Sequence, residues 1–401
     1  MRGGSTGTTD GRRRRGRTAA VCAVLLAAVL GTGAVPAGAA PGAAPWAGER
    51  GHEATQRAFD VFTESGLPGV LARVDGPGGR SWTGRSGVAD LRTERSRRDT
   101  DRFRMGSVTK TFTATLLLQL EARGALSLDD SVDHWLPGLV RGNGHDGRAV
   151  TLRQLLNHTS GVHNYTDDAE FQRRLGPGFL RYRYHAYTPR DLVAFAMRYR
   201  PVFPPGRGWR YSNTNYVLAR MVIEKAGGAS YAAQLRERVT GPLGLRGTSA
   251  PGHSPVLPGP HGRGYSKDAA GRIFDSTRQD PSWAGAAGDL VSTTHDLNRF
   301  YRALLSGRLL PPAQRAELLG GVRIDPRGRQ TYGLGLQSRL LSCGVRTWEH
   351  SGGLHGSLTW TVSTADGGRQ LTFNVNGDWL EREEPVVAVL ETVFCPGGSR
   401  A

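Results

Sequence analysis

The sequence predicts an α/β sandwich, in which a mostly antiparallel sheet is flanked by helices and a helical lobe is inserted on one side. Segments typical of strands occur near both ends of the chain, at 69–88 and 331–375, and the part between them is rich in helices and loops. The 401 residues are 38% hydrophobic and 22% charged, an ordinary globular composition for one large domain or two lobes sharing a core. Strands at both ends with helices between them favour the sandwich.

The first 39 residues have the composition of a secretory signal peptide. Arginines cluster at 12–17, an apolar run follows at 19–30, and Ala37-Gly38-Ala39 offers a small-residue cleavage site. The apolar run is too short for a stable membrane anchor, although an uncleaved anchor and twin-arginine export remain alternatives. Residues 40–51 are expected to be a linker, and residues 52–396 the folded domain. We therefore expect a secreted, soluble protein without a stable membrane anchor.

Two strand-like segments open the folded region, and a long helix follows. Residues 69–74 and 81–88 have the character of strands, and a Gly-Pro-Gly-Gly turn sequence separates them. The pattern predicts a helix from about Ser107 to Arg123, which Gly124 ends. The body of this helix, at 116–120, is apolar on most sides and is therefore expected to be buried in the middle of the protein.

Helices are predicted in the middle of the chain, and strands return near its end. One helix runs from about 213 to 225 and stops at Gly227-Gly228, and another begins near Thr293, with Asp296 in a capping pattern. The later predicted elements are strands at 331–336, 345–349, 357–363 and 370–375, and an amphipathic helix at 385–394.

Lys110 is one of three lysines among the 52 Lys and Arg residues, and Ser107 lies three positions before it. Residues three apart share one helical face, with about 5–6 Å between their Cβ atoms. A serine hydroxyl needs a base beside it to become a nucleophile, and burial can lower the pKa of a lysine from about 10.4 far enough to make it that base. A lone S-x-x-K also fits a capping serine and a surface lysine. The scarcity of lysine and the buried helix favour catalysis.

Two further motifs carry groups suited to the same chemistry. Tyr211-Ser212-Asn213 precedes a predicted helix; its hydroxyl can shuttle protons and its amide can orient substrate and base. His350-Ser351-Gly352 closes a predicted strand and leads into Gly353; an edge strand can pair with a peptide-like substrate, and glycines let backbone N–H groups approach an oxyanion. Taken singly, the first motif also fits a packed tyrosine and a helix cap, and the second a Gly-rich hairpin with a surface histidine.

In this order and spacing, the three motifs resemble the serine β-lactamase and penicillin-binding-protein superfamily. The superfamily pattern is S-x-x-K, then Y-x-N, then Lys or His followed by Thr or Ser and Gly. The sequences FRMGSVTK at 103–110 and LLNHTSG at 155–161, and Ala287-Gly288 followed by Ser292-Thr293, extend the resemblance to about residues 55–395. It implies a β-lactamase-like sandwich and a serine hydrolase that works through an acyl-enzyme, without a cofactor.

Within the superfamily, the closest resemblance is to secreted actinobacterial D-alanyl-D-alanine carboxypeptidases, which have His in the third motif. It implies that Ser107 is the nucleophile and that Lys110 and Tyr211 share proton transfer. The oxyanion hole would be formed by the backbone N–H groups of Ser107 and Gly353. The substrate cleft would be lined by Asn213, Trp283, His350, Ser351 and Gly352.

The chain also departs from the carboxypeptidase pattern. The third motif usually reads H-T-G-T, whereas here Gly353 lacks the second hydroxyl. The arginine that would hold a substrate carboxylate is replaced by Gln337. Arg339 lies two residues further along, on the same face of a strand, and is the candidate replacement. The acylation groups are all present, and the identity of the leaving group stays open.

Cys343 and Cys395 are an even pair outside the predicted signal peptide. They fit either a disulfide, which would stabilise the fold by roughly 4 kcal/mol for so long a loop, or two buried thiols. The carboxypeptidases that the chain resembles have a C-terminal disulfide, which favours the bridge.

The charge pattern excludes some partners. The formal net charge of +17 fits attraction to anionic wall polymers or an arginine-biased genome, and its scattered distribution does not predict nucleic-acid binding. The sequence contains no H-E-x-x-H motif and no cysteine cluster, so no metal site is predicted. It also contains no phosphate-binding Gly loop followed by Lys.

We expect a monomeric, secreted serine D-alanyl-D-alanine carboxypeptidase-type hydrolase that acts on peptidoglycan stem peptides and reacts with β-lactams. A β-lactamase-related esterase, a D-amino-acid amidase and a β-lactamase are the alternatives on the same scaffold. Gly353 and Gln337 favour the esterase or amidase, and His350 disfavours the β-lactamase. A third class is a non-catalytic protein that binds wall fragments or β-lactams. The complete Ser–Lys–Tyr–Asn–His set argues against that class.

Overall fold

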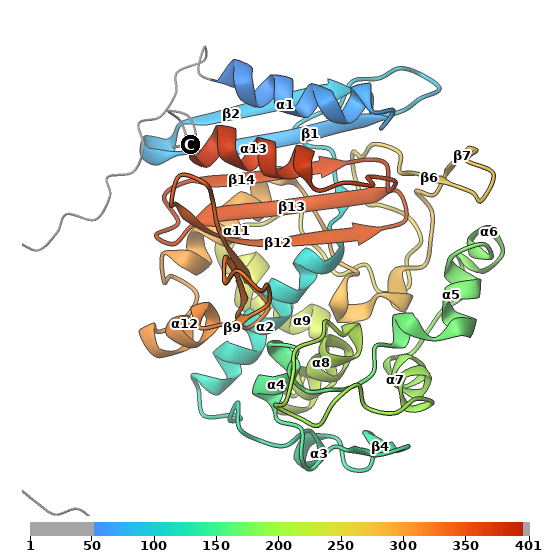
Figure 1. Cartoon of the computed structure of the whole chain (residues 1–401), viewed down its shortest axis with the longest axis vertical. Helices are drawn as coiled ribbons and strands as arrows, with labels where there is room; N and C mark the ends of the chain where they lie inside the picture. The colour runs from blue at the N-terminus through green and yellow to red at the C-terminus, as the bar shows by residue number, and fades with distance from the viewer. Residues whose placement is uncertain (1–51, 396–401) are drawn as a thin grey trace, which may run out of the picture. The chain divides into compact units, whose positions relative to one another are not determined.

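An eight-stranded antiparallel sheet forms the centre of the computed structural model, which describes residues 52–395. The strands lie in the order β2-β1-β14-β13-β12-β11-β10-β9 (Figure 1). Their bounds are β1 Gly69–Asp75, β2 Ser81–Gly87, β9 Val322–Arg323, β10 Gln330–Tyr332, β11 Gln337–Leu340, β12 Arg346–Leu354, β13 Ser357–Thr364 and β14 Gln370–Val375. The predicted α/β sandwich with a mostly antiparallel sheet is confirmed.

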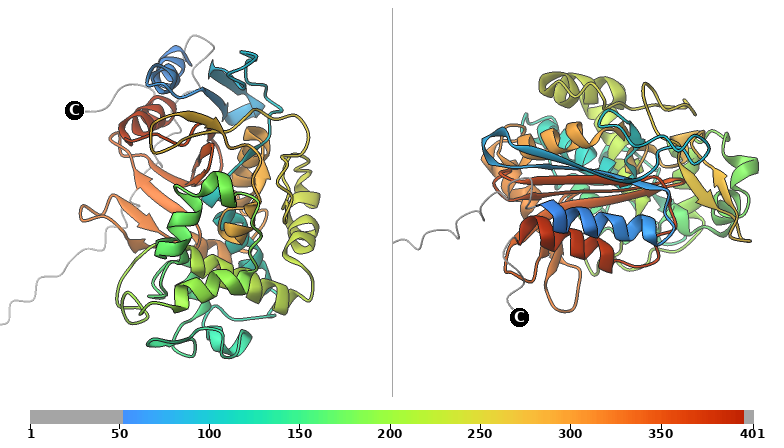
Figure 2. Two further views of the ribbon diagram at one scale, coloured as in Figure 1. Left: turned by 90° about the vertical axis from the view of Figure 1, so that its right-hand side faces the viewer. Right: turned by 90° about the horizontal axis from the view of Figure 1, so that it is seen from above.

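Helices cover both faces of this sheet. On one face, α1 (Glu53–Glu64) packs beside α13 (Glu384–Phe394), so the two ends of the described chain lie together (Figure 2). Phe59 and Phe62 of α1 meet Phe373 of β14 there, in an apolar cluster that also holds Val389. On the other face, α11 (Thr294–Leu305) crosses β1, β13 and β14.

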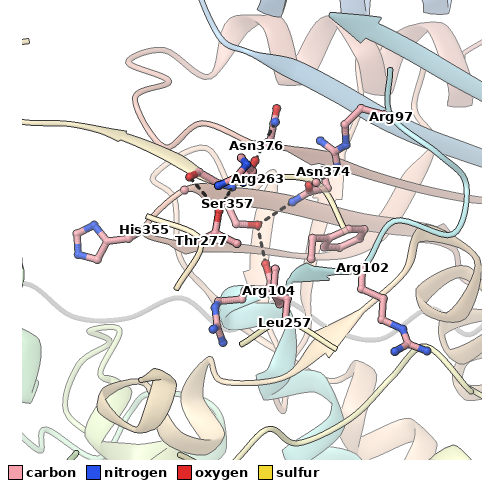
Figure 3. A pocket seen from close by; sticks show the side chains of 14 residues that line it. Arg97, Arg102, Arg104, Leu257, Arg263, Thr277, His355, Ser357, Asn374 and Asn376 are labelled. Carbon is pink, nitrogen blue, oxygen red and sulfur yellow. Dashed lines mark hydrogen bonds between the residues drawn. The ribbon is translucent and has the colours of Figure 1, made fainter. Parts of the chain in front are cut away.

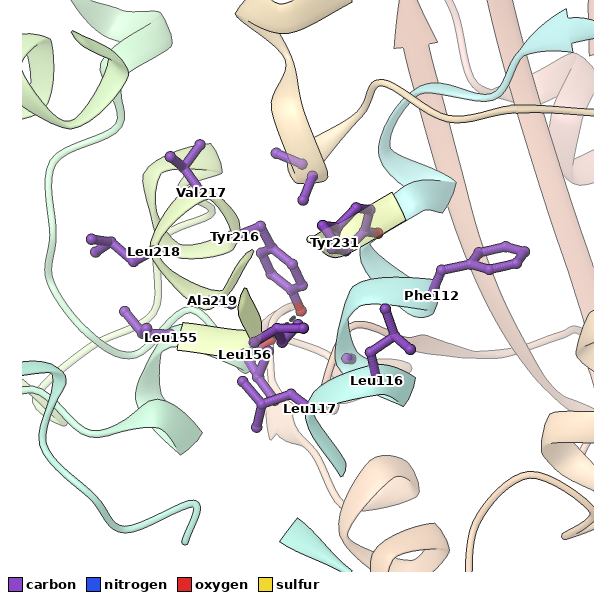
Figure 4. Packing of buried hydrophobic residues seen from close by; sticks show 14 of the residues in the cluster. Phe112, Leu116, Leu117, Leu155, Leu156, Tyr216, Val217, Leu218, Ala219 and Tyr231 are labelled. Carbon is purple, nitrogen blue, oxygen red and sulfur yellow. Dashed lines mark hydrogen bonds between the residues drawn. The ribbon is translucent and has the colours of Figure 1, made fainter. Parts of the chain in front are cut away.

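The helical lobe is built on α2 (Thr109–Glu121) and α8 (Asn213–Gly227), which pack together. α9 (Tyr231–Leu235) contacts both of them, and α4 (Leu152–Leu156) and α7 (Pro189–Met197) pack against α8. Figure 4 shows Leu117 of α2 and Tyr216 of α8 in this core. All residues of α2 except Gln119 and Glu121 are buried, as its apolar body predicts. Within residues 52–395, no helix has the length and apolar character of a membrane span.

The remaining elements are short. The helices are α3 (Val132–Trp135), α5 (Ala169–Leu175), α6 (Phe179–Tyr182), α10 (Gly241–Leu243) and α12 (Pro312–Leu319). Three small strand pairs join β3 (Phe103–Arg104) to β8 (Val291–Ser292), β4 (Arg141–Gly142) to β5 (His145–Asp146), and β6 (Tyr265–Lys267) to β7 (Ile273–Asp275). The 3₁₀ turns η3 (Gly106–Val108) and η7 (Gly285–Ala287) take part in the site described below.

The predicted strand at 331–336 is wrong in its second half. Strand β10 ends at Tyr332, and the chain then turns through Gly335, whose φ is +72°. The Gly335 N–H donates to the carbonyl oxygen of Leu156, and its carbonyl oxygen accepts a 2.7 Å hydrogen bond from Thr111 Oγ1. A Cβ atom at Gly335 would lie 2.7 Å from that of Ala114, so only glycine lets the chain approach α2 this closely.

Candidate active site

Ser107 lies in η3, at the point where β3 gives way to α2, and its side chain is partly exposed. The strand before it is tied to the sheet by Ser357, whose Oγ donates to the Arg104 carbonyl at 2.7 Å and accepts from Asn374 Nδ2 at 2.8 Å (Figure 3). The buried Arg104 guanidinium in turn donates to two backbone carbonyls at 3.0 Å. Ser107 is therefore held on rigid backbone at the start of a buried helix.

Lys110 lies completely buried beneath Ser107. Its Nζ is 3.0 Å from Ser107 Oγ, 2.8 Å from Asn213 Oδ1 and 2.7 Å from the Ala287 carbonyl oxygen. Burial lowers the pKa of Lys110 well below its ordinary value, because the charged amine loses its hydration.

The three partners of Lys110 decide where its lone pair points. An amide oxygen and a backbone carbonyl oxygen can only accept hydrogen bonds. A neutral amine has two N–H bonds, which Asn213 Oδ1 and the Ala287 carbonyl use. In this neutral form the remaining lone pair would face Ser107 Oγ, which could donate its proton. The geometry is that of a base hydrogen-bonded to a serine nucleophile.

Tyr211 and Asn213, on either side of the buried Ser212, are partly exposed at the entrance of the site. The Tyr211 side chain is close enough to Ser107 to interact with it, and the Tyr211 ring lies 4.7 Å from Lys110 Nζ. Burial raises the pKa of Tyr211, and the interaction with Ser107 opposes this effect, so the phenol stays protonated at neutral pH. The structure therefore brings Ser107, Lys110, Tyr211 and Asn213 together.

Strand β12 comes close to Ser107, and glycine residues make this close approach possible. A Cβ atom at Gly352 would lie 2.1 Å from the Met105 carbonyl oxygen and 2.5 Å from the Ser107 nitrogen. A Cβ atom at Gly106 would lie 2.5 Å from the Gly353 nitrogen. The segments at Gly106 and Gly352 thus cross at a distance that only glycine residues allow. The backbone amides of Ser107 and Gly353 lie at this crossing.

The edge of β12 beside the site is open on one side. Strand β11 pairs with β12 only between Arg346 and Glu349, whereas β13 follows β12 as far as Leu354. Ser351 and Gly353 are exposed on this stretch. Strand β12 lies inside the sheet, but its end has the free edge that addition of a peptide-like substrate requires.

The sequence predicts that His350 lines the substrate cleft. In the structure this histidine is buried beneath the site. Its side chain is 4% exposed, and burial and the nearby Lys110 lower its pKa to about 3. Nδ1 is 2.6 Å from the Ser351 carbonyl oxygen and must donate to it, so Nε2 of the neutral ring accepts from the Tyr332 hydroxyl at 3.0 Å. His350 therefore supports the site from behind.

Arg339 is engaged in two ion pairs. Its Nε lies 2.8 Å from Glu349 and its Nη2 lies 2.5 Å from Glu383, and its side chain is 14% exposed. Because two carboxylates already share this guanidinium, the expected role of Arg339 in holding a substrate carboxylate is not favoured.

The other predicted residues lie at different depths. Trp283 is half-buried, its Nε1 donates to Gln279 Oε1 at 3.4 Å, and its ring lies 6.1 Å from that of His355. The sulfur atoms of Cys343 and Cys395 lie at disulfide-bonding distance, with 5.9 Å between the Cα atoms. This pair joins the end of α13 to the turn between β11 and β12.

Three contributors to the site were not assigned a role from the sequence. The Ala287 carbonyl oxygen accepts a hydrogen bond from Lys110 Nζ, the Tyr332 hydroxyl hydrogen-bonds with His350, and His158 packs against Tyr211. Ala287 and His158 lie in segments that carry the family resemblance. The resemblance therefore pointed to these segments but did not assign a function to either residue. Tyr332 lies in a predicted strand with no distinguishing pattern.

Comparisons with known proteins agree with this geometry. Residues 35–390 match the family profile described as Beta-lactamase. The chain is 30% identical over 322 residues to penicillin-binding protein 4* of Bacillus subtilis (strain 168), covering 77% of this chain and 68% of that protein. It is 31% identical over 351 residues to the esterase EstB of Burkholderia gladioli, covering 77% and 86%.

A solved structure is more similar still. The D-stereospecific amidohydrolase from a Streptomyces species shares 48% sequence identity with this chain, and its fold superposes with a TM-score of 0.81. The match covers 86% of this chain and 99% of that one. The penicillin-binding protein, the esterase and the amidohydrolase thus share one scaffold.

Proposed function

Because the chain belongs to the β-lactamase family of serine hydrolases, we propose that Ser107 is its nucleophile and that its substrates are amides and esters of D-amino acids. The observation that carries the proposal is the 3.0 Å contact between Lys110 Nζ and Ser107 Oγ, made by an amine whose other two partners only accept. The site is therefore suited to deprotonating Ser107.

The reaction would proceed through an acyl-enzyme. Ser107 Oγ attacks the substrate carbonyl carbon while its proton passes to Lys110 Nζ. The oxygen of the tetrahedral intermediate accepts hydrogen bonds from the amides of Ser107 and Gly353. Tyr211, which contacts Ser107, then passes a proton to the leaving amine or alcohol as the carbon–nitrogen or carbon–oxygen bond breaks. Water attacks the ester by the reverse proton transfers and releases the acid.

The choice of a D-amino acid amide over a D-alanyl-D-alanine peptide rests on Arg339 and on similarity. A carboxypeptidase must hold a terminal carboxylate, and Arg339 is already paired with Glu349 and Glu383. The amidohydrolase that shares 48% identity with this chain is D-stereospecific by description. The pairing of Arg339 supports a leaving group without a charge, and the similarity supports an amide of a D-configured acyl group.

Asp167 follows Thr166, which contacts Asn213, and is the candidate partner for a free amine on the acyl group. Thr166 Oγ1 lies 3.4 Å from Asn213 Nδ2, and the neighbouring Asp167 is held by Asn164 at 3.1 Å and by Arg210 at 3.3 Å. The Asp167 side chain is 35% exposed, so it has room for a further partner. We propose that it meets the α-ammonium group of the substrate, and that Asp167→Asn raises KM for a D-amino acid amide but not for its N-acetyl derivative.

A D-alanyl-D-alanine carboxypeptidase is the second candidate. The open edge of β12 suits an extended peptide, and the similarity to penicillin-binding protein 4* supports reaction with β-lactams. An esterase is the third, supported by the similarity to EstB.

A substrate panel separates the candidates. We expect D-phenylalanine amide and a D-amino acyl ester to be cleaved, with the L-amide and a D-alanyl-D-alanine peptide at least about tenfold slower, which corresponds to about 1.4 kcal/mol in the barrier. Ser107→Ala should abolish every activity. Ser81→Ala, which removes an exposed hydroxyl on the edge strand β2, is the matched control. Preferred cleavage of the D-alanyl-D-alanine peptide would make the carboxypeptidase the correct assignment.

We further propose that residues 1–39 direct secretion, that the mature protein is a monomer, and that Cys343 and Cys395 are bridged in it. Protein recovered from the culture medium should begin near Ala40, have a mass two units below that of the reduced chain, and sediment as one copy. Retention of the N-terminal segment on membranes would contradict the secretion proposal.

A further inference from the structure

His158 holds both backbone neighbours of Tyr211. Its carbonyl oxygen accepts a 3.1 Å hydrogen bond from the Arg210 N–H, and its ring Nδ1 accepts a 3.2 Å hydrogen bond from the Ser212 N–H. His158 is completely buried just after α4, and its φ is +63°. Asparagine, aspartate and histidine adopt this left-handed conformation more readily than most residues. The conformation lets the carbonyl and the ring of one residue reach the same passing chain.

A second hydrogen bond fixes the tautomer of this ring. Asn215 Oδ1 accepts from Ser160 Oγ at 2.7 Å, which turns Asn215 Nδ2 toward His158 Nδ1 at 3.2 Å. A backbone N–H and an amide NH₂ group can only donate, so Nδ1 must be unprotonated and the proton must lie on Nε2. Protonation of Nδ1 would break both contacts. Burial lowers the pKa of His158 well below its ordinary value, which keeps the ring neutral.

The same ring is packed against Tyr211. The centroids of the His158 and Tyr211 rings are 4.3 Å apart. The Tyr332 ring, whose hydroxyl hydrogen-bonds with His350, lies 4.7 Å from the His158 ring. By contrast, Asn213 has its own support, because its N–H donates to Asn164 Oδ1 at 2.9 Å. The contacts of His158 therefore act on Tyr211 more than on the rest of the motif.

We propose that His158 is a positioning residue for the reaction, which holds the Tyr211 hydroxyl against Ser107 and the Tyr211 ring over Lys110. The proposal rests on the Ser107 chemistry proposed above. The hydrogen bonds to Arg210 and Ser212 hold the backbone on both sides of Tyr211, and the ring contact limits rotation of its side chain. A misplacement of about 1 Å in a proton-transfer group can cost about a hundredfold in rate.

Two substitutions divide the functions of His158. His158→Phe keeps a ring against Tyr211 but removes the acceptor, leaving the Ser212 N–H and Asn215 unpaired. His158→Asn loses the ring but keeps an acceptor near Nδ1 and tolerates the left-handed φ. The matched control is His145→Phe, the same change at a second buried histidine, which lies in β5.

The measurements are single-turnover acylation rates with a D-amino acyl ester and the pH dependence of kcat/KM. Single-turnover rates do not depend on the fraction of the protein that folds. We expect about a hundredfold loss in His158→Phe, a smaller loss in His158→Asn, and no loss in His145→Phe. KM should change little, because the interaction matters in the transition state.

The pH profile separates positioning from a general loss of stability. The titratable groups facing Lys110 are Tyr211, Tyr216, His158 and His350. If Tyr211 moves away, water reaches Lys110, the pKa of the amine rises toward its ordinary value, and the acid limb of kcat/KM moves to higher pH. In wild type, ¹⁵N NMR should show His158 with its proton on Nε2 at neutral pH.

Distinct results would overturn the two proposals. Wild-type acylation and an unmoved acid limb in His158→Phe, equal effects in His145→Phe, or a proton on His158 Nδ1 at neutral pH would each contradict the positioning role. An active His158→Phe beside an inactive Ser107→Ala would overturn only that role. An active Ser107→Ala would instead overturn the proposed function.

Discussion

At the scale of single residues, the site depends on a lysine whose charged form is disfavoured by burial. Lys110 is buried, its Nζ lies 3.0 Å from Ser107 Oγ, and its two other partners can only accept hydrogen bonds. The neighbouring histidines contribute no positive charge, because burial lowers the pKa of His350 to about 3 and that of His158 strongly. The histidines therefore add no positive charge, and burial favours the neutral form of the amine beside the Ser107 hydroxyl.

The pH dependence of activity follows from the lowered pKa of Lys110. The protonated amine cannot accept the Ser107 proton, so kcat/KM should fall only as the pH drops through the lowered pKa. We expect kcat/KM to reach its plateau well below pH ~10.4, the ordinary pKa of lysine. Initial rates with a D-amino acid amide across pH measure this. An activity that keeps rising up to that ordinary pKa would contradict Lys110 as the base.

Removal of the Tyr211 hydroxyl tests its part in proton transfer. Tyr211→Phe keeps the ring beside Lys110 but loses the contact with Ser107. We expect kcat and kcat/KM to fall by about 10²- to 10⁴-fold, the usual contribution of a general acid–base group, with little change in thermal stability. If Tyr211→Phe turned over a D-amino acyl ester at the wild-type rate, proton transfer would be assigned to Lys110 alone.

The roles of residues were partly predictable from the sequence. Ser107 and Lys110 lie three positions apart at the start of an apolar helix, which a local pattern reveals. The support of His350 by Tyr332, eighteen positions away, depends on how strands pair, and the inward turn of His350 depends on a backbone carbonyl next to it. Neither dependence leaves a local pattern in the sequence.

At the scale of elements, the crossing of η3 and β12 positions the amides proposed for the oxyanion. This crossing needs Gly106 and Gly352, where a side chain would collide with backbone atoms rather than with flexible side chains. The ends of α2, β12 and α8 meet there, so a small displacement of one element moves the nucleophile relative to the others.

Gly352→Ala should therefore damage catalysis more than stability. Its Cβ would fall 2.1 Å from the Met105 carbonyl oxygen, so β12 and η3 must separate. We expect kcat/KM to fall by about a hundredfold. Gly320→Ala is the control, because its Cβ would lie 3.4 Å from its nearest neighbour, and it should stay active. Equal activities in the two variants, with thermal unfolding compared in parallel, would contradict the close crossing.

Element prediction succeeded where local signals act alone. The predicted strand at 370–375 coincides with β14, and Gly228, with φ +66°, ends α8 as its position predicts. The Thr293 side chain caps α11 by accepting from the Asp296 N–H at 3.1 Å. The strand at 331–336 failed because Gly335 leaves the sheet to contact α2, an element more than two hundred positions away.

At the scale of the whole molecule, the two ends of the described chain complete one sheet. Strand β1 pairs with β14, and α1 lies against α13. The alternation of strands and helices predicts this sandwich, but the order of the strands depends on pairings between distant segments. The bridge proposed between Cys343 and Cys395 would keep α13 attached to the sheet.

Loss of this bridge should lower stability without removing activity. The two cysteines are separated by 52 positions and lie at the far end of β12 from its glycines. We expect the double variant Cys343→Ala/Cys395→Ala to be less stable by about 2–4 kcal/mol in denaturant unfolding, with kcat/KM near wild type at 25 °C. Unchanged stability, together with two free thiols in the unfolded wild type, would mean that no bridge forms.

Mass spectrometry can show whether Ser107 becomes acylated during turnover. Rapid mixing with a D-amino acyl p-nitrophenyl ester should release one equivalent of nitrophenolate in a burst. The protein should gain the mass of the acyl group, and peptide mapping should locate that mass on Ser107. Ser107→Ala should show neither burst nor adduct, whereas Ser81→Ala should show both. An adduct on another residue, or turnover by folded Ser107→Ala, would contradict the account.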